Sequence, residues 1–133
     1  MSKSALYATN TTGQTISVTT DTTINFGQPV RRFGCDTYLS GGNAIIRGCG
    51  YYAIDTVVNF TALAAGTVVV QLFKDGVAIP GAASTISMVA DDVNSFEISS
   101  LVRNTCECES TITAVISGAT GTINTASIRV IKL

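Results

Sequence analysis

The residues that could carry chemistry are few, and the most reactive are four cysteines. They are Cys35, Cys49, Cys106 and Cys108. The spacing of the last two puts both thiols on one face of an extended segment. Four thiolates could hold zinc, but the closely spaced cysteine pairs of structural zinc sites are missing. Buried free thiols are the favoured interpretation, because cysteine is among the most buried residue types. Disulfides and a metal site remain as alternatives.

Acid–base catalysis has little to work with in this sequence. Histidine is absent, which removes the commonest general base and the commonest metal ligand. The close carboxylate pairs are Asp91 with Asp92 and Glu107 with Glu109. Adjacent strand residues point to opposite faces, so Asp91 and Asp92 do not form a natural catalytic pair. We therefore expect turn and surface roles for these carboxylates, no enzyme activity and no cofactor.

The composition indicates one weakly charged domain. Of the 133 residues, 46% are hydrophobic and only 13% are charged, which is about half the usual charged share. Such a surface is typical of a protein that other subunits partly cover. The net charge of −1 and the scattered basic residues argue against a nucleic-acid partner. No apolar run reaches the length of a membrane span, and the first residues lack a secretion signal.

Short runs rich in Val, Ile and Thr, separated by turn residues, predict many strands. The expected strands are residues 5–9, 15–19, 23–26, 43–47, 51–62, 67–73, 84–89, 95–101, 110–117 and 124–131. This spacing predicts an all-β sandwich or barrel. No linker or repeat divides the chain, so we expect a single domain over residues 1–133.

The stretch CGYYAIDTVVNF, residues 49–60, predicts a strand with two different faces. One parity holds Tyr52, Ile54, Val58 and Phe60, with Thr56 between them. The other parity holds Tyr51, Ala53, Asp55, Val57 and Asn59. This second face is too apolar for open solvent and too polar for an ordinary core.

A tight turn is predicted within VVVQLFKDGVAIPGA, residues 68–82. Gly76 is free to take a positive φ and can reverse the chain after Asp75. Pro80 cannot donate a backbone hydrogen bond, so Pro80 and Gly81 should end the returning segment. That segment should lie at a sheet edge or in a loop.

Together these segments resemble the central signature of the tumour-necrosis-factor and complement globular-head jelly rolls. That signature has Gly-x-Tyr-x-aromatic at the start of a long strand, followed by a strand ending in Leu-aromatic-Lys/Arg-Asn/Asp-Gly. Gly50, Tyr52 and Ile54 match the first part, with Ile in place of the usual Phe. Residues 72–76, LFKDG, match the second part. The last nine residues, TASIRVIKL, resemble the closing strand of such domains.

The resemblance implies a ten-stranded, two-sheet jelly roll that assembles as a compact homotrimer. In this family the long Tyr-containing strand packs one face in the core and turns the other toward neighbouring protomers. The trimer interface would then be lined by Tyr51, Ala53, Asp55, Val57, Asn59 and Arg129. We expect Asp55 and Arg129 to pair, within one protomer or across the interface. The alternative is a monomer in which a loop covers the second face.

The resemblance also suggests a function, because the family contains signalling ligands, complement heads, spore-surface tips and bacteriophage virion proteins. The run DGVAIPGA and the short terminal strand are similar to bacterial and prophage members. We therefore expect a trimeric virion protein made in the host bacterial cytoplasm and displayed on the particle, as a head fibre, capsid decoration or receptor-binding tip.

The expected partners are other copies of the chain, other virion proteins and a host-surface carbohydrate or protein, without nucleic acid or membrane insertion. Residues 1–40 could include an attachment segment. The alternative function is the globular tip of a bacterial surface or spore-coat protein.

Overall fold

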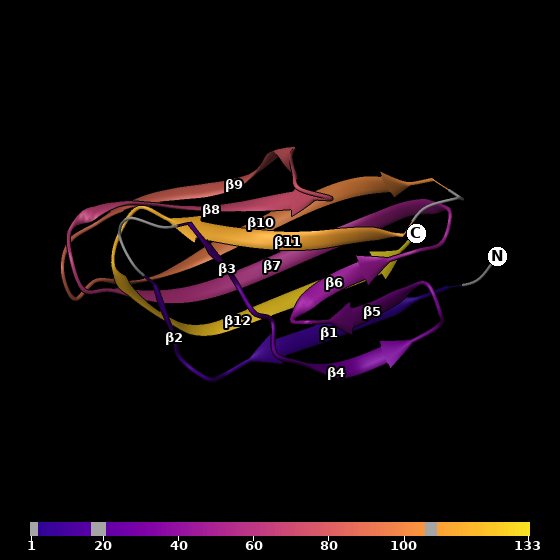
Figure 1. Cartoon of the computed structure of the whole chain (residues 1–133), viewed down its shortest axis with the longest axis horizontal. Coiled ribbons are helices and arrows are strands. Elements are labelled where there is room, and N and C mark those ends of the chain that lie inside the picture. The colour runs from indigo at the N-terminus through magenta and orange to yellow at the C-terminus, as the bar shows by residue number, and fades with distance from the viewer. Residues whose placement is uncertain (1–2, 17–20, 106–108) are drawn as a thin grey trace.

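The chain folds into two antiparallel β-sheets stacked as a sandwich (Figure 1). The computed structural model describes residues 3–16, 21–105 and 109–133. The first sheet has, in spatial order, β10 (Val93–Asn104), β7 (Gly50–Ala62), β12 (Gly121–Lys132), β1 (Ala5–Asn10) and β4 (Gln28–Phe33), with β2 (Gln14–Ile16) beside β12. The second has β5 (Thr37–Ser40), β6 (Asn43–Ile46), β11 (Ser110–Ser117), β8 (Gly66–Lys74) and β9 (Val77–Met88), with β3 (Thr22–Thr23) beside β11.

The number of strands differs from the expected ten, because the described residues form twelve. The two strands that the sequence pattern missed are β4 and β5. β4 is exposed along its whole length and contains Pro29, so it lacks the alternation of a half-buried strand. β5 has only four residues, too few to show a period. Of the strand expected at residues 23–26, only Thr23 lies in a strand. That strand is β3, which covers Thr22–Thr23.

The core lies between the two sheets and confirms the predicted parity of β7. The side chains of Tyr52, Ile54, Val58 and Phe60 are completely buried. The Phe60 ring meets Phe96 of β10 edge to face, with ring centroids 6.5 Å apart. Apolar side chains from β8 and β11 close the core from the second sheet. Within the described residues, no helix is long and apolar enough to cross a membrane.

The hairpin between β8 and β9 confirms the predicted turn. Asp75 and Gly76 have φ values of 52° and 82°, which is the two-residue conformation that suits the twist of antiparallel strands. β9 is the outer strand of its sheet, as the position of Pro80 predicts.

The expectation that Pro80 and Gly81 end the returning segment is wrong, because β9 continues to Met88. The pairing of β8 with β9 shifts register between Gln71 and Phe73. The Gln71 side-chain amide donates to the carbonyl oxygens of Leu72, Ile79 and Ala82 at 2.9–3.1 Å. These bonds satisfy the carbonyls that the irregular segment leaves without ladder partners, so the strand can pass through the proline.

One end of the sandwich is held by buried polar contacts. The Tyr52 hydroxyl donates to the Gly48 carbonyl at 2.7 Å and accepts from the Gly48 amide at 3.0 Å. Lys132 pairs with Asp36 at 2.6 Å, and their side chains are only 10% and 16% exposed. Burial raises the pKa of Tyr52 above its ordinary 10.0, and the hydrogen bond with Asp36 raises the pKa of Lys132 above 10.5.

We expect the protein to lose stability in alkaline solution. A raised folded pKa means that Tyr52 and Lys132 stabilise the fold in full below about pH 10, and that this contribution is lost as the pH rises through the folded values. The urea concentration at half-unfolding should therefore fall above about pH 10. Replacing Lys132 with methionine should reduce the size of that fall. An equal fall in wild type and variant would contradict the role of Lys132.

Candidate subunit interface

The candidate site is the face of the first sheet that points away from the core, which we call the open face. Strand alternation brings to this face the residues whose neighbours fill the core. The six residues predicted for the interface all lie on it: Tyr51, Ala53, Asp55, Val57, Asn59 and Arg129. Ile128 and Val130 are buried on the opposite side, which confirms the predicted parity of the last strand.

An apolar row crosses the open face from one edge of the sheet to the other. Residues opposite one another on successive strands make up this row, namely Leu101, Ala53, Ile131, Ala5 and Phe33. Leu101 and Phe33 are 57% and 59% exposed in the single chain. A continuous apolar strip of this kind marks a surface suited to burial against another protein.

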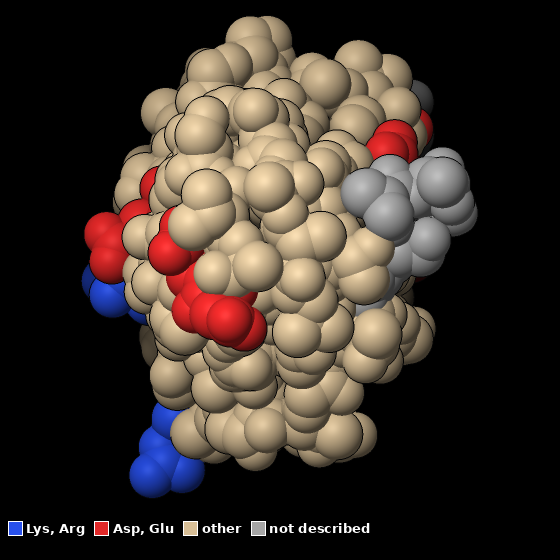
Figure 2. Space-filling model, turned by 90° about the vertical axis from the view of Figure 1, so that its left-hand side faces the viewer, with Lys and Arg blue, Asp and Glu red and all other residues tan. Residues whose placement is uncertain are grey.

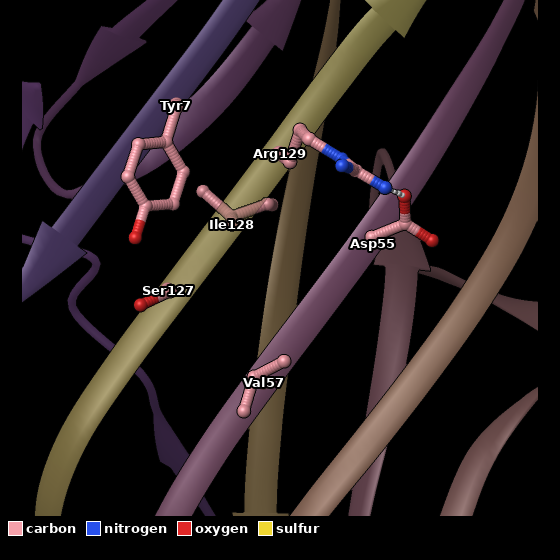
Figure 3. A pocket seen from close by; sticks show the side chains of 6 residues that line it. All are labelled: Tyr7, Asp55, Val57, Ser127, Ile128 and Arg129. Carbon is pink, nitrogen blue, oxygen red and sulfur yellow. Dashed lines mark hydrogen bonds and ion pairs between the residues drawn. The ribbon is translucent and has the colours of Figure 1, made fainter. Parts of the chain in front are cut away.

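A charged row lies beside the apolar row, and its centre is the pair of Asp55 and Arg129. The Asp55 carboxylate accepts from Arg129 Nη2 at 2.5 Å and Nε at 3.1 Å. Its other oxygen accepts from the Ser99 hydroxyl at 2.7 Å. The Arg129 guanidinium and the Ser99 hydroxyl hold the pKa of Asp55 below its ordinary value. The expected pairing is therefore confirmed, and it occurs within one chain (Figure 3).

Further along the strands, the polar side chains of the open face also bond to one another. The Asn59 amide donates to the Thr125 hydroxyl at 2.6 Å and accepts from the Ser95 hydroxyl. The hydroxyls of Thr9 and Ser127 are 2.9 Å apart. Because these bonds lie within one chain, a covering subunit would not have to supply partners for these groups.

A shallow hollow of about 420 Å³ lies at the centre of the open face. Its lining comes from β1, β7 and β12, with Tyr7, Val57 and Arg129 around it (Figure 3). The hollow can receive a side chain from another molecule, which suits recognition.

Solved structures with the same architecture extend over nearly the whole chain. Murine APRIL has a TM-score of 0.78 at 17% identity, covering 99% of this chain and 100% of that one. PRD1 vertex protein P5 has a TM-score of 0.68 at 11% identity, covering 98% and 96%. Eiger TNF from S. frugiperda has a TM-score of 0.64 at 12% identity, covering 98% and 91%.

The fold is a tumour-necrosis-factor-like jelly roll. At these identities the likeness shows the fold alone. No protein-family model matches the sequence, and the curated proteins contain no match.

The two cysteines within the described residues are not the buried free thiols that the sequence analysis favoured. Cys35 is free but exposed, and Cys49 is disulfide-bonded. Both lie in surface turns between strands. Cys106 and Cys108 lie outside the described residues. Within the described part of the chain, no group of three or more potential ligands is placed to hold a metal.

Three of the four carboxylates in the close pairs lie within the described residues. Asp91 and Asp92 form the turn between β9 and β10, where Asp92 accepts from the Val89 amide at 2.9 Å. Glu109 accepts from the Tyr38 hydroxyl at 2.8 Å, and Glu107 lies outside the described residues. Asp91 and Asp92 therefore have the turn role that the sequence predicts.

Several residues of the open face were missed by sequence reasoning. Tyr7, Leu101 and Ile131 lie there because they alternate with buried neighbours, so the period of their strands could have identified them. Phe33 gave no such signal, because β4 is exposed throughout. Figure 2 shows one end of the sandwich with only a few charged side chains, as the composition predicts.

Proposed function

We propose that this chain is a non-enzymatic, homotrimeric protein displayed on the surface of a bacteriophage virion. It would act as a head fibre, a capsid decoration or a receptor-binding tip. The TNF-like fold that it shares with PRD1 vertex protein P5 supports a structural role, and its resemblance to bacterial and prophage sequences supports the source. The observation that carries self-association is the apolar row, which crosses the whole width of the open face.

The second surface needed for a ring lies at the edge formed by β9 and β10. An apolar hollow of about 450 Å³ there is lined in part by Val77, Ile79 and Pro80. Packing this edge against the open face of the next copy joins two different surfaces, and such contacts form rings when the rotation closes. Closure at three copies is what the family resemblance implies.

We expect light scattering at micromolar concentration to give about three times the chain mass of 13.8 kDa. Ile131→Glu should shift the mass toward the monomer, because it places an unpaired charge in the apolar row. Leu63→Glu is the matched control, since Leu63 is exposed in the turn between β7 and β8. A monomer mass for the wild type, or equal effects of both variants, would rule out this interface.

The role on a particle needs its own experiment. Antibodies raised against the purified chain should label the surface of intact virions from the producing strain in electron micrographs. Labelling of cells or spores without labelling of particles would favour the alternative, a tip domain of a bacterial surface protein.

A further inference from the structure

Two arginines and a tyrosine form a cluster at the edge of the sandwich where β4 and β5 meet. The guanidinium carbons of Arg47 and Arg32 lie 5.3 and 5.8 Å from the centroid of the Tyr38 ring. The Tyr38 hydroxyl donates to Glu109 at 2.8 Å, which fixes the ring from its far end. The cluster therefore joins side chains from β4, β5 and the turn that follows β6.

Both arginines are held in place but keep donors available. Arg32 Nε donates to the Thr37 carbonyl at 2.7 Å, and Arg47 Nε donates to the Cys35 carbonyl at 2.8 Å. Among the described residues, neither guanidinium is paired with a carboxylate. Two guanidinium groups with free terminal nitrogens are suited to a carboxylate or sulfate, which they can bind through charge-assisted hydrogen bonds.

The cluster opens into two adjoining hollows, which together we call the groove. The arginines and Tyr38 line a hollow of about 310 Å³, and Pro29 and Leu39 form the rest of its lining. Pro29 and Leu39 also line a neighbouring hollow of about 530 Å³. The groove therefore carries its positive charge at one end.

The second hollow is polar and uncharged. Its walls carry Asn25, Gln28 and Thr12, together with three glycines. The Asn25 side-chain oxygen accepts from the Gly27 amide at 2.7 Å, and its NH₂ group makes no hydrogen bond to the described residues, so it remains a donor for a ligand. Within the described structure the side-chain amide of Gln28 makes no hydrogen bond. Side-chain amides and hydroxyls of this kind match the hydroxyl groups of a sugar.

We propose that this groove binds an acidic saccharide. Its carboxylate or sulfate group lies between Arg32 and Arg47, and its hydroxyl groups bond to Asn25 and Gln28. A saccharide is favoured over an acidic peptide, because Pro29 removes a backbone donor that a peptide would need to add as a strand to β4. The inference names a ligand class for the surface-binding role proposed above. It rests on that role only for the place where the protein would meet the saccharide.

The test is an NMR titration of the ¹⁵N-labelled protein with four short probes. These are a galacturonic acid trisaccharide, galactose 6-sulfate, a neutral galactose trisaccharide and triglutamate. An acidic sugar should shift the amide signals of residues 27, 28 and 38–42 and the Nε–H signals of Arg32 and Arg47. The neutral sugar should bind about tenfold more weakly or worse, since it lacks the charge-assisted bonds. The tighter acidic sugar identifies the anionic group as carboxylate or sulfate.

Matched variants separate a built site from general charge attraction. Arg32→Gln and Arg47→Gln should each weaken binding of the better acidic sugar about tenfold. Arg31→Gln is the control, because Arg31 directly precedes Arg32 in β4 but pairs with Tyr7 on the open face. Gln28→Ala should weaken binding of the sugar and leave triglutamate unaffected.

Three results would overturn the proposal. They are no shifts with either acidic sugar, equal losses in the Arg31 and Arg32 variants, or triglutamate binding as tightly as the sugars. The Arg32, Arg47 and Gln28 variants, which lie away from the open face, should keep the mass of the wild type in light scattering. A failure to bind saccharide would therefore leave the proposed assembly untouched.

Discussion

Replacing Tyr52 with alanine should lower the free energy of unfolding by about 3–5 kcal/mol, the range for removing a buried aromatic side chain. Tyr52 is completely buried and is among the largest side chains of the core. Its loss leaves a cavity, and it also removes the hydroxyl that bonds both backbone groups of Gly48. Urea unfolding at a fixed protein concentration measures this change.

The adjacent residue provides the control for this prediction. Tyr51 has the same type of side chain on the same strand but is 51% exposed on the open face. Tyr51→Ala should therefore change the intrinsic stability of the fold far less. Tyr52→Phe should fall between them, since it keeps the ring and leaves the Gly48 N–H without its partner, at a cost of about 1–3 kcal/mol. Equal effects of the two alanine variants would contradict the assignment of core and open face.

The second large effect is expected at Asp55. Replacing it with alanine should weaken the trimer by about 3–5 kcal/mol, the range for leaving one partner of a buried ion pair uncompensated. In the single chain the side chains of Arg129 and Asp55 are 58% and 35% exposed. A large effect therefore requires that a neighbouring subunit cover them. The measurement is the dissociation constant of the trimer for each variant.

A double-mutant cycle with Asp55→Ala and Arg129→Ala separates the two possible environments of the pair. An ion pair that stays in solvent is worth about 0–1 kcal/mol, whereas a covered pair should show a much larger coupling in trimer stability. A coupling within the solvent-exposed range would contradict burial of the open face. Asn59→Ala tests whether a neutral group on the same face behaves differently from the charged pair.

The fold could be predicted from the sequence wherever a strand has one solvent-exposed face and one buried face. β7 alternates strictly and β12 alternates from Thr125 to Ile131, so their core residues and the neighbouring positions of Asp55 and Arg129 followed from parity. β4 and β5 were missed for the opposite reason, since one is exposed throughout and the other is too short. The continuation of β9 through Pro80 depends on hydrogen bonds from Gln71, which lies in β8. The local sequence around Pro80 gives no sign of this contact.

The sites show the same division between local and long-range information. The open face repeats with the strand period, so most of it can be derived from sequence. The cluster of Arg32, Tyr38 and Arg47 comes from three segments, and two of its members lie in or beside strands with no clear alternation. Only the pairing of β5 with β6 and the contact between β4 and β5, the edge strands of the two sheets, bring the three together.

The exposed edge strand β4 has a consequence for how copies of this chain can meet one another. An outer strand offers unpaired backbone groups to any other strand, which is how soluble proteins begin to form fibrils. β4 carries Pro29 and two arginines, and its pairing with β1 is broken by a bulge between Tyr7 and Ala8. Each of these features hinders the addition of a further strand. Crowded copies can therefore meet through side chains without polymerising through their backbones.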